Sequence, residues 1–325
     1  MSEPDQAKLT GLPRVPLATL PTPVQPLPRL SARLGIELSV KRDDLTGLAF
    51  GGNKTRKLEL LLADAIAQGS DTLVTVGAVQ SNHCRQTAAA AASHGLACAL
   101  VLVGDRPSQL TGNLLLDELL GAELHWARGD RTEALETLVR QLEEAGAKPY
   151  RVPYGGSNHL GAAAYALAMG EFLGQSSPVD RVVLASSSGG TQAGLLLGAE
   201  LFGFVGSVMG ISVEPGSEEL RASIRRLLDQ SSASLSLEAK IDDARIQVTD
   251  RYLGGGYAVV GALERQAVRL FAETEGLLLD PVYTGRAAGG MVNMVERGEI
   301  GSGERVLFWH TGGTPALFAY PTQAG

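Results

Sequence analysis

Lys54 follows two glycines and an asparagine in the segment GLAFGGNKT, residues 47–55. The segment is close to the phosphate-binding loop in which Gly-Lys is followed by Ser or Thr, but Asn53 separates Gly52 from Lys54. This insertion turns the lysine by about 100° around a following helix. A lysine at a helix start lies near the positive end of the helix dipole, which favours the neutral amine that forms a Schiff base with an aldehyde. An ordinary surface lysine, as expected for Lys57, is the alternative, and the residues alone leave both open.

A second segment, VVLASSSGGTQAGLLLGA (182–199), predicts a strand, a polar loop and an apolar helix. Backbone amides at the helix start and the hydroxyl groups of the loop form an anion site, and the glycines let a phosphate approach the backbone closely. The chain has no G-x-G-x-x-G pattern and no Walker lysine. A phosphate site without a nucleotide motif, together with a lysine that can bind an aldehyde, predicts pyridoxal 5'-phosphate as the cofactor. For each glycine cluster by itself, a simple turn is the alternative interpretation.

The composition restricts the possible partners. The 325 residues include 28 basic and 35 acidic side chains, and the formal net charge is −7, which provides no basic surface for nucleic acid or an anionic membrane. Cys84 and Cys98 are too few for a disulfide framework, and the five histidines lack metal-ligand spacing. The first residues have no signal-peptide pattern, and no stretch of about 18 apolar residues follows. We therefore expect a cytoplasmic protein that binds a small molecule and has no metal in its site.

The order of apolar runs predicts the fold class. Strand-like runs at 71–77, 97–104 and 180–187 alternate with helical patterns such as 55–69 and 111–121. Alternating strands and helices of these lengths predict an α/β fold with parallel sheets that are covered by helices on both faces.

Strand-like runs recur on both sides of a predicted connecting helix at 162–174. We therefore expect a large domain formed by residues 1–50 and 161–325, with a small domain inserted at residues 51–160.

Two segments are expected to lie outside this framework. Seven of the 15 prolines fall within the first 28 residues, which predicts an extended surface arm rather than a helix, with the folded body beginning near Leu30. The serine-rich segment SSASLSL (231–237) predicts a mobile loop.

Four ordered motifs resemble the family of 1-aminocyclopropane-1-carboxylate deaminases and D-cysteine desulfhydrases, from about residue 15 to the C-terminus. The motifs are KRDDLTGLAFGGNKTRKLE (41–59), GAVQSNHCRQTAAAAA (77–92), LLLDPVYTGRAAGGM (277–291) and HTGGTPALFAY (310–320). The resemblance implies the tryptophan-synthase-β fold of pyridoxal-phosphate enzymes (fold type II), with two open parallel-sheet domains and the cofactor in the cleft between them. It also implies a homodimer and a small amino-acid substrate.

The resemblance assigns roles to residues of these motifs. Lys54 corresponds to the Schiff-base lysine, and Asn82 to the asparagine that hydrogen-bonds the oxygen on the cofactor ring. Ser81 and His83 are expected to face the substrate. An ordinary helix N-cap is the alternative, which would explain Ser81 and Asn82 but not the whole motif. The expected phosphate loop consists of Ser187, Ser188, Gly189, Gly190 and Thr191.

Two tyrosines also match the family. Tyr283 in PVYTG and Tyr257 in GGGYAV correspond to its active-site tyrosines. A phenol whose pKa is shifted can transfer protons, and we assign this role to Tyr283. For Tyr257, a buried tyrosine with a satisfied hydroxyl group is the competing interpretation.

Thr284 and Thr311 stand where the deaminases that this chain resembles have glutamate and leucine. A carboxylate beside the pyridine nitrogen would keep it protonated and make the cofactor a strong electron sink, as the opening of a cyclopropane requires. Hydroxyl groups suit the elimination of a good leaving group, and His83, where the deaminases have glutamine, agrees with this interpretation. We therefore expect β-elimination from D-cysteine to pyruvate, sulfide and ammonia, with Lys54 taking the Cα proton and Tyr283 or His83 assisting the leaving group.

Three alternatives stay open. Elimination of sulfite from L-cysteate would need a cation for the sulfonate, for which Arg85 and Arg286 are candidates, and the chain could also be a 1-aminocyclopropane-1-carboxylate deaminase. A non-catalytic pyridoxal-phosphate-binding protein is the alternative from another class. It would not need both the base Lys54 and the acid Tyr283.

Overall fold

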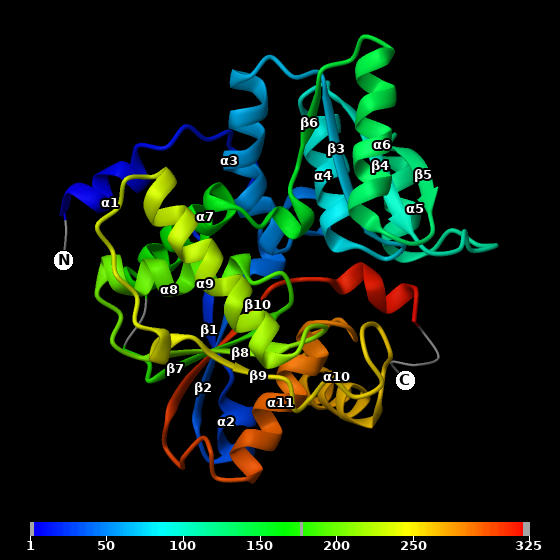
Figure 1. Ribbon diagram of the computed structural model, residues 1–325. Coiled ribbons are helices and arrows are strands. Elements are labelled where there is room, and N and C mark those ends of the chain that lie inside the picture. Colours follow the sequence, from blue (N-terminus) through cyan, green and yellow to red (C-terminus); the bar gives the residue numbers. More distant parts are fainter. Residues whose placement is uncertain (1–2, 176–177, 321–325) are drawn as a thin grey trace.

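The computed structural model describes residues 3–175 and 178–320. Two β-sheets organise these residues, one with four strands in the order β5-β4-β3-β6 and one with six in the order β1-β2-β10-β7-β8-β9. Figure 1 shows the four-stranded sheet in its upper half and the six-stranded sheet below it, each packed against helices.

The four-stranded sheet is entirely parallel. Its strands are β3 (Thr72–Ala78), β4 (Ala97–Val103), β5 (Glu123–Ala127) and β6 (Pro149–Arg151). Neighbouring residues of β3 enter different cores, as expected for a sheet that is buried on both faces. Leu73 packs with α3 (Asn53–Ala67), α4 (Asn82–Ser93) and α5 (Gly112–Leu119), whereas Val74 packs with α6 (Arg131–Glu144).

The six-stranded sheet is parallel except for its edge strand β1, which runs antiparallel to β2. Its strands are β1 (Val24–Pro26), β2 (Glu37–Arg42), β7 (Arg181–Ser186), β8 (Ser207–Ser212), β9 (Gln247–Thr249) and β10 (Arg305–His310). Leu184 packs with α7 (His159–Leu173), α8 (Gly190–Phe202) and α9 (Ser217–Ser234) on one face. Val183 packs on the other face with α2 (Pro28–Leu34), α10 (Ala262–Glu275) and α11 (Thr284–Glu296).

Short turns connect these elements. The 3-10 helices are η1 (Asp43–Leu45), η2 (Leu48–Phe50), η3 (Tyr154–Gly156), η4 (Asp243–Arg245) and η5 (Thr314–Phe318). No helix within residues 3–175 and 178–320 is long and apolar enough to cross a membrane. Cys84 and Cys98 are buried free thiols.

The predicted α/β architecture is confirmed. The strands expected at 71–77, 97–104 and 180–187 are β3, β4 and β7, and the helices expected at 55–69, 111–121 and 162–174 are α3, α5 and α7, with ends that differ by a few residues.

The prediction of an extended N-terminal arm is wrong for residues 3–10, which form α1 (Glu3–Thr10). Pro4 is the only proline of that segment, and it stands in the first helical turn, where its missing N–H is not needed. Leu9 is fully buried in the core around α7 and α8, so the folded body begins well before Leu30.

The prediction of a mobile loop at 231–237 is also wrong. Residues 231–234 are the last turn of α9, and Leu237 is buried. The Ser231 hydroxyl donates to the carbonyl of Leu227 at 2.7 Å, which satisfies this polar group inside the helix.

The division into two domains stays a prediction. The strands of the smaller sheet all lie between Thr72 and Arg151. However, α3 packs on both sides, with Leu60 in the core around α7 and Leu61 in the core of the smaller sheet.

Candidate functional site

A pocket lies between the two sheets, at the carboxyl ends of their strands. Ala78 at the end of β3, Ser186 at the end of β7 and Thr311 directly after β10 contribute to its wall. Parallel α/β sheets bind ligands at this edge, where strands end and helices begin. The full lining is Asn53, Lys54, Ala78, Ser81, Asn82, His83, Tyr154, Gly155, Ala185, Ser186, Ser187, Ser188, Gly189, Thr191, Tyr257, Tyr283, Thr311 and Gly312.

Lys54 is the second residue of α3 and points into this pocket. Its Nζ donates a hydrogen bond to the carbonyl of Gly155 at 3.0 Å. Burial lowers the pKa of Lys54 from its ordinary value to about 8, because the charged ammonium loses hydration. A Cβ on Gly155 would lie 2.6 Å from Ser188 Oγ and 3.4 Å from Lys54 Nζ, so the glycine makes room for both side chains. The sequence motif thus delivers a lysine whose neutral form is accessible near pH 8.

Lys57 is fully buried, so the expectation that it is a surface lysine is wrong. Its Nζ donates to the same Gly155 carbonyl at 3.1 Å and lies 3.4 Å from Ser157 Oγ. Burial and the charge of Lys54 hold the pKa of Lys57 well below its usual range. A Cβ on Gly190 would lie 3.0 Å from Lys57 Nζ, which places this cation behind the start of α8. The spacing of three residues, which puts Lys54 and Lys57 on one side of a helix, could have indicated this.

The loop before α8 has the features of an anion site. Gly189 takes a left-handed conformation with φ 81°, and no side chain caps the amides at the helix start. Those amides therefore remain available to a ligand. Thr191 Oγ1 accepts a hydrogen bond from Asn53 Nδ2 at 3.0 Å, which leaves its own proton free to donate.

Three other residues of this loop are less available to a ligand than Thr191. Ser188 Oγ lies 2.7 Å from Ser157 Oγ. Ser187 donates to Glu214 Oε2 at 3.1 Å, so its hydroxyl proton is already used. Gly190 does not line the pocket, and a Cβ there would lie 2.4 Å from Ser157 Oγ, which explains the glycine.

Asn82 is held in one orientation by a residue that the sequence did not reveal. Asn113 Nδ2 donates to the carbonyl of Gln80 at 3.0 Å and to Asn82 Oδ1 at 2.9 Å. Because Asn82 Oδ1 is occupied, its Nδ2 group is the part that can donate to an acceptor in the pocket.

Ser81 is the N-cap of α4, since its Oγ accepts a hydrogen bond from the Cys84 amide at 3.2 Å. The N-cap interpretation is therefore confirmed for Ser81, which also lines the pocket. Burial raises the pKa of the Cys84 thiol well above its ordinary value, and this residue packs in the core behind the pocket.

His83 is buried and neutral. Thr75 Oγ1 donates its only proton to the carbonyl of Val152 at 2.8 Å, so it can only accept from His83 Nε2, which lies 2.9 Å away. Nδ1 is then the unprotonated nitrogen, and it is buried without a partner. Burial, together with the charges of Lys54 and Lys57, lowers the pKa of His83 well below its ordinary value. Near pH 7 this imidazole can accept a proton but has none to give to the pocket.

The two tyrosines form a pair. Their hydroxyl oxygens are 2.8 Å apart, and their rings meet edge to face with centroids 6.0 Å apart. Burial raises the pKa of Tyr283 well above the ordinary value and raises that of Tyr257 as well. Both phenols therefore stay protonated near neutral pH and can act as hydrogen-bond donors or acids.

The two threonines, Thr284 and Thr311, differ in whether they reach the pocket. Thr311 lines the pocket, whereas Thr284 is fully buried outside the lining. Thr284 Oγ1 donates to Asp280 Oδ1 and accepts from the Asp280 amide, both at 2.8 Å. None of the lining residues is acidic.

These features fit pyridoxal phosphate. Its phosphate matches the uncapped start of α8, its aldehyde matches the buried amine of Lys54, and its ring oxygen matches the oriented amide of Asn82. The pocket contains eleven of the thirteen residues that the sequence nominated, all except Gly190 and Thr284. Among the residues that were not predicted, Asn53 and Tyr154 contribute polar groups to its wall, and Asn113 and Lys57 lie behind it.

Comparisons with known proteins agree with this fit. Residues 15–312 match the family described as "Pyridoxal-phosphate dependent enzyme". A D-cysteine desulfhydrase of Klebsiella pneumoniae is 42% identical over 322 residues, which cover 96% of this chain and 97% of that protein. A putative 1-aminocyclopropane-1-carboxylate deaminase of Pyrococcus abyssi is 41% identical over 322 residues, with coverage of 97% and 96%.

Solved structures agree on the fold. An ACC deaminase homologue superposes with a TM-score of 0.92 at 39% identity, covering 100% of this chain and 99% of the other. Threonine deaminase isoform 2 of Solanum lycopersicum superposes with a TM-score of 0.69 at 16% identity, covering 95% and 88%. The expected fold type II architecture is therefore confirmed.

Proposed function

The chain belongs to the family of pyridoxal-phosphate-dependent enzymes that contains D-cysteine desulfhydrases and 1-aminocyclopropane-1-carboxylate deaminases, and from this premise we propose that it eliminates sulfide from D-cysteine. The observation that carries the proposal is the absence of a carboxylate from the lining of the pocket, where Thr311 is present instead. When bound, pyridoxal phosphate stabilises negative charge at the substrate Cα, most strongly when its ring nitrogen is protonated. A lining without a carboxylate supports a reaction with a good leaving group, such as the thiol of cysteine.

Lys54 would hold the aldehyde of the cofactor and take the proton from the substrate Cα. With a pKa of about 8, roughly a tenth of this amine is neutral at pH 7, against well under a thousandth for an ordinary lysine. The hydrogen bond from Nζ to Gly155 keeps the amine beside the pocket wall. These features support a base that works near neutral pH.

Tyr283 is the proposed acid that protonates the departing sulfur. Its phenol is protonated at neutral pH and contacts Tyr257, which can hold its orientation. His83, with a bare Nδ1, is suited to accept a hydrogen bond from the substrate instead. This favours Tyr283 over His83 as the group that assists the leaving group.

The pocket gives less support to cysteate as substrate. Arg85 donates to the carbonyl of Gly51 at 2.8 Å, and Arg286 pairs with Glu264 at 2.6 Å. Both arginines are buried, and neither lines the pocket, so neither is placed to bind a sulfonate there.

Product release from purified protein tests the proposal. The substrates are D-cysteine, L-cysteine, L-cysteate and 1-aminocyclopropane-1-carboxylate, and the Lys54→Ala variant is the control. Pyruvate and sulfide from D-cysteine, absent with Lys54→Ala, would support it. Release of sulfite from L-cysteate would instead identify cysteate as the substrate. Release of 2-oxobutyrate would identify 1-aminocyclopropane-1-carboxylate as the substrate. Bound cofactor with no product from any of them would indicate a non-catalytic binding protein.

We also propose, from the family resemblance, that the enzyme works in the cytoplasm as a homodimer. Light scattering on the purified protein and fractionation of cells that express it would test these two statements.

A further inference from the structure

The motif that carries Lys54 contains other buried charged residues, and three of them form one cluster away from the pocket. Lys41, Asp43 and Arg56 have at most 4% exposure, and none lines the pocket. Buried charges are rare unless they are paired and hydrogen-bonded. The proposed reaction leaves these three residues unexplained.

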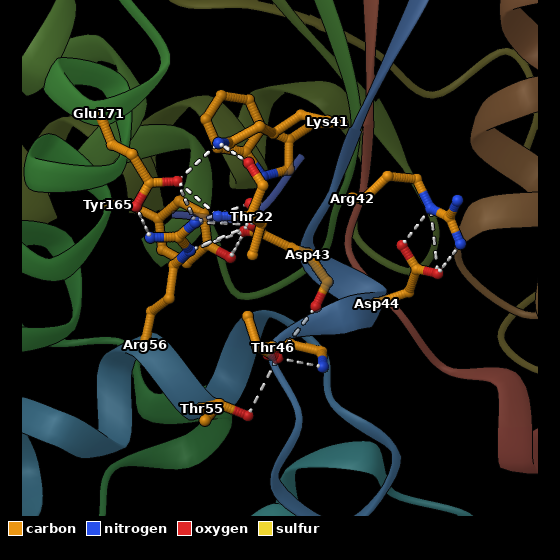
Figure 2. A network of polar contacts seen from close by, with 12 residues as sticks. Thr22, Lys41, Arg42, Asp43, Asp44, Thr46, Thr55, Arg56, Tyr165 and Glu171 are labelled. Carbon is orange, nitrogen blue, oxygen red and sulfur yellow. Dashed lines mark hydrogen bonds and ion pairs between the residues drawn. The ribbon is translucent and has the colours of Figure 1, made fainter. Parts of the chain in front are cut away.

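Asp43 is the centre of the network in Figure 2. Arg56 Nε donates to both of its oxygens at 3.1 Å, and Arg56 Nη2 donates to Oδ1 at 2.9 Å. Three more donors complete its shell: Thr22 Oγ1 at 2.9 Å, Tyr165 OH at 2.6 Å and Trp309 Nε1 at 2.8 Å. Burial by itself would raise the pKa of Asp43, but the charge and hydrogen bonds of Arg56 lower it below the ordinary value.

Glu171 of α7 binds the other side of the Arg56 guanidinium. Arg56 Nη1 and Nη2 donate to its two oxygens at 2.9 and 2.8 Å. Lys41 donates to Glu171 Oε1 at 2.6 Å and to the Thr22 carbonyl at 2.7 Å. Two carboxylates thus face two cations, so that the buried cluster is electrically balanced.

Asp43 also holds the turn that precedes Lys54. The Gly52 amide donates to the Asp43 carbonyl at 3.0 Å and to Thr46 Oγ1 at 2.8 Å. Thr46 Oγ1 lies 3.3 Å from Thr55 Oγ1, at the first turn of α3. Asp43 therefore binds the chain before Lys54 through its backbone and the chain after Lys54 through its carboxylate.

The contacts of Arg56 with Asp43 and Glu171 restrict the rotation of α3 about its axis. Lys54 and Arg56 are two residues apart, which is about 200° around the helix, so their side chains leave on nearly opposite sides. A rotation of α3 by about 10° would move a side-chain tip about 6 Å from the axis by about 1 Å. A displacement of that size at a reacting group costs about 100-fold in rate.

We propose that Asp43 and Arg56 are positioning residues for Lys54. They act by fixing the rotation of the first turn of α3, because the carboxylates of Asp43 and Glu171 both bind the guanidinium of Arg56. The inference rests on the proposed role of Lys54. An arginine suits this task because its planar fork binds two carboxylates at fixed angles, whereas a lysine supplies charge without direction.

Arg56→Lys in the holoenzyme is the test, because it keeps the charge and loses the fork. Lys41→Met is the matched control, since Lys41 is equally buried in the cluster but has no hydrogen bond to α3. Two properties are measured: kcat and KM, and the pH midpoint of the visible absorbance band of the cofactor held by Lys54, without substrate. We expect Arg56→Lys to lower kcat by about 100-fold with little change in KM and to shift that midpoint. We expect Lys41→Met to lower the thermal midpoint only.

Two results would overturn the inference: an Arg56→Lys enzyme with unchanged kcat and band midpoint, or a Lys41→Met enzyme that shows the same changes as Arg56→Lys. If Arg56→Lys does not fold, Glu171→Gln is used instead, because this substitution removes one of the two negative charges that bind Arg56 and changes the side-chain shape little. An unchanged band in Glu171→Gln would then refute the inference. The band needs no turnover, so failure of the wild-type enzyme on every amino acid would reject the proposed function and leave this test intact.

Discussion

Replacement of Lys54 by methionine should stabilise the cofactor-free protein while it abolishes turnover. Folding transfers this lysine from water to the pocket and lowers its pKa from 10.5 to about 8. The charged form is therefore less favoured in the folded state than in the unfolded state. Methionine has a similar length and no charge, so Lys54→Met removes this unfavourable contribution.

The size of the effect depends on pH. A lysine whose pKa is lowered on folding destabilises the folded state most strongly at pH values below both its folded and its unfolded pKa. The destabilisation disappears as the pH rises above the unfolded pKa. The shift from 10.5 to about 8 corresponds to about 3 kcal/mol at pH 7. At pH 10 the folded lysine is neutral and about a quarter of the unfolded lysine is neutral as well, so the cost is below about 1 kcal/mol. Lys54 keeps some exposure to the pocket, so these values are upper bounds.

Urea unfolding of cofactor-free wild type and Lys54→Met at pH 7 and pH 10 measures the difference. Lys240→Met, at an exposed lysine, is the control and should change stability little at either pH. A stability gain for Lys54→Met that is present at pH 7 and mostly lost at pH 10 is the expected result. A gain that is equal at both values would come from packing and would refute the electrostatic reasoning, as would no gain at pH 7.

Three further substitutions test the pocket. Tyr283→Phe should lower kcat by about 100-fold or more, since it removes the proposed acid, and steady-state kinetics with D-cysteine measures this; an unchanged kcat would exclude the role. Asn113→Ala should weaken the binding of pyridoxal phosphate about fivefold to tenfold, because Asn82 loses the hydrogen bond that orients it; titration of cofactor-free protein shows whether the affinity falls. Thr311→Leu should reduce kcat/KM for D-cysteine more than Thr284→Ser, which keeps the hydroxyl bonded to Asp280; equal losses would contradict the role given to the Thr311 hydroxyl in a pocket without a carboxylate.

The sequence predicted those parts of the site that are local. The loop from Ser187 to Thr191 was recognisable because a strand, a glycine loop and a helix follow one another, and in the structure this loop leads into α8, with Gly189 as the N-cap. Lys54 was recognisable because it directly follows the glycines at the start of α3. In both cases the backbone of a few consecutive residues determines where the functional group points.

Residues that depend on tertiary contacts were missed. Asn113 lies 31 residues from the Asn82 side chain that it orients, and no local pattern links the two. Lys57 looked like a surface lysine, because its burial depends on the distant turn around Gly155. The helix α1 was missed for a different reason: six of the seven prolines in the first 28 residues follow it, and only Pro4 lies within it.

The contacts of α3 show how Lys54, the proposed attachment point of the cofactor aldehyde, is held relative to the two sheets. Its first turn is fastened to Asp43 after β2 and to Glu171 of α7, and the anion site lies between β7 and α8. All of these elements belong to the six-stranded sheet or its helices, although Leu61 further along α3 packs in the core of the smaller sheet. Asn82, by contrast, follows β3 of the smaller sheet. The first turn of α3 also contacts α4 on the smaller sheet, because the Thr55 amide and hydroxyl donate to Gln86 Oε1 at 2.7 and 2.8 Å. The proposed aldehyde position is therefore held from both sheets, whereas the proposed phosphate position lies between β7 and α8 of the six-stranded sheet.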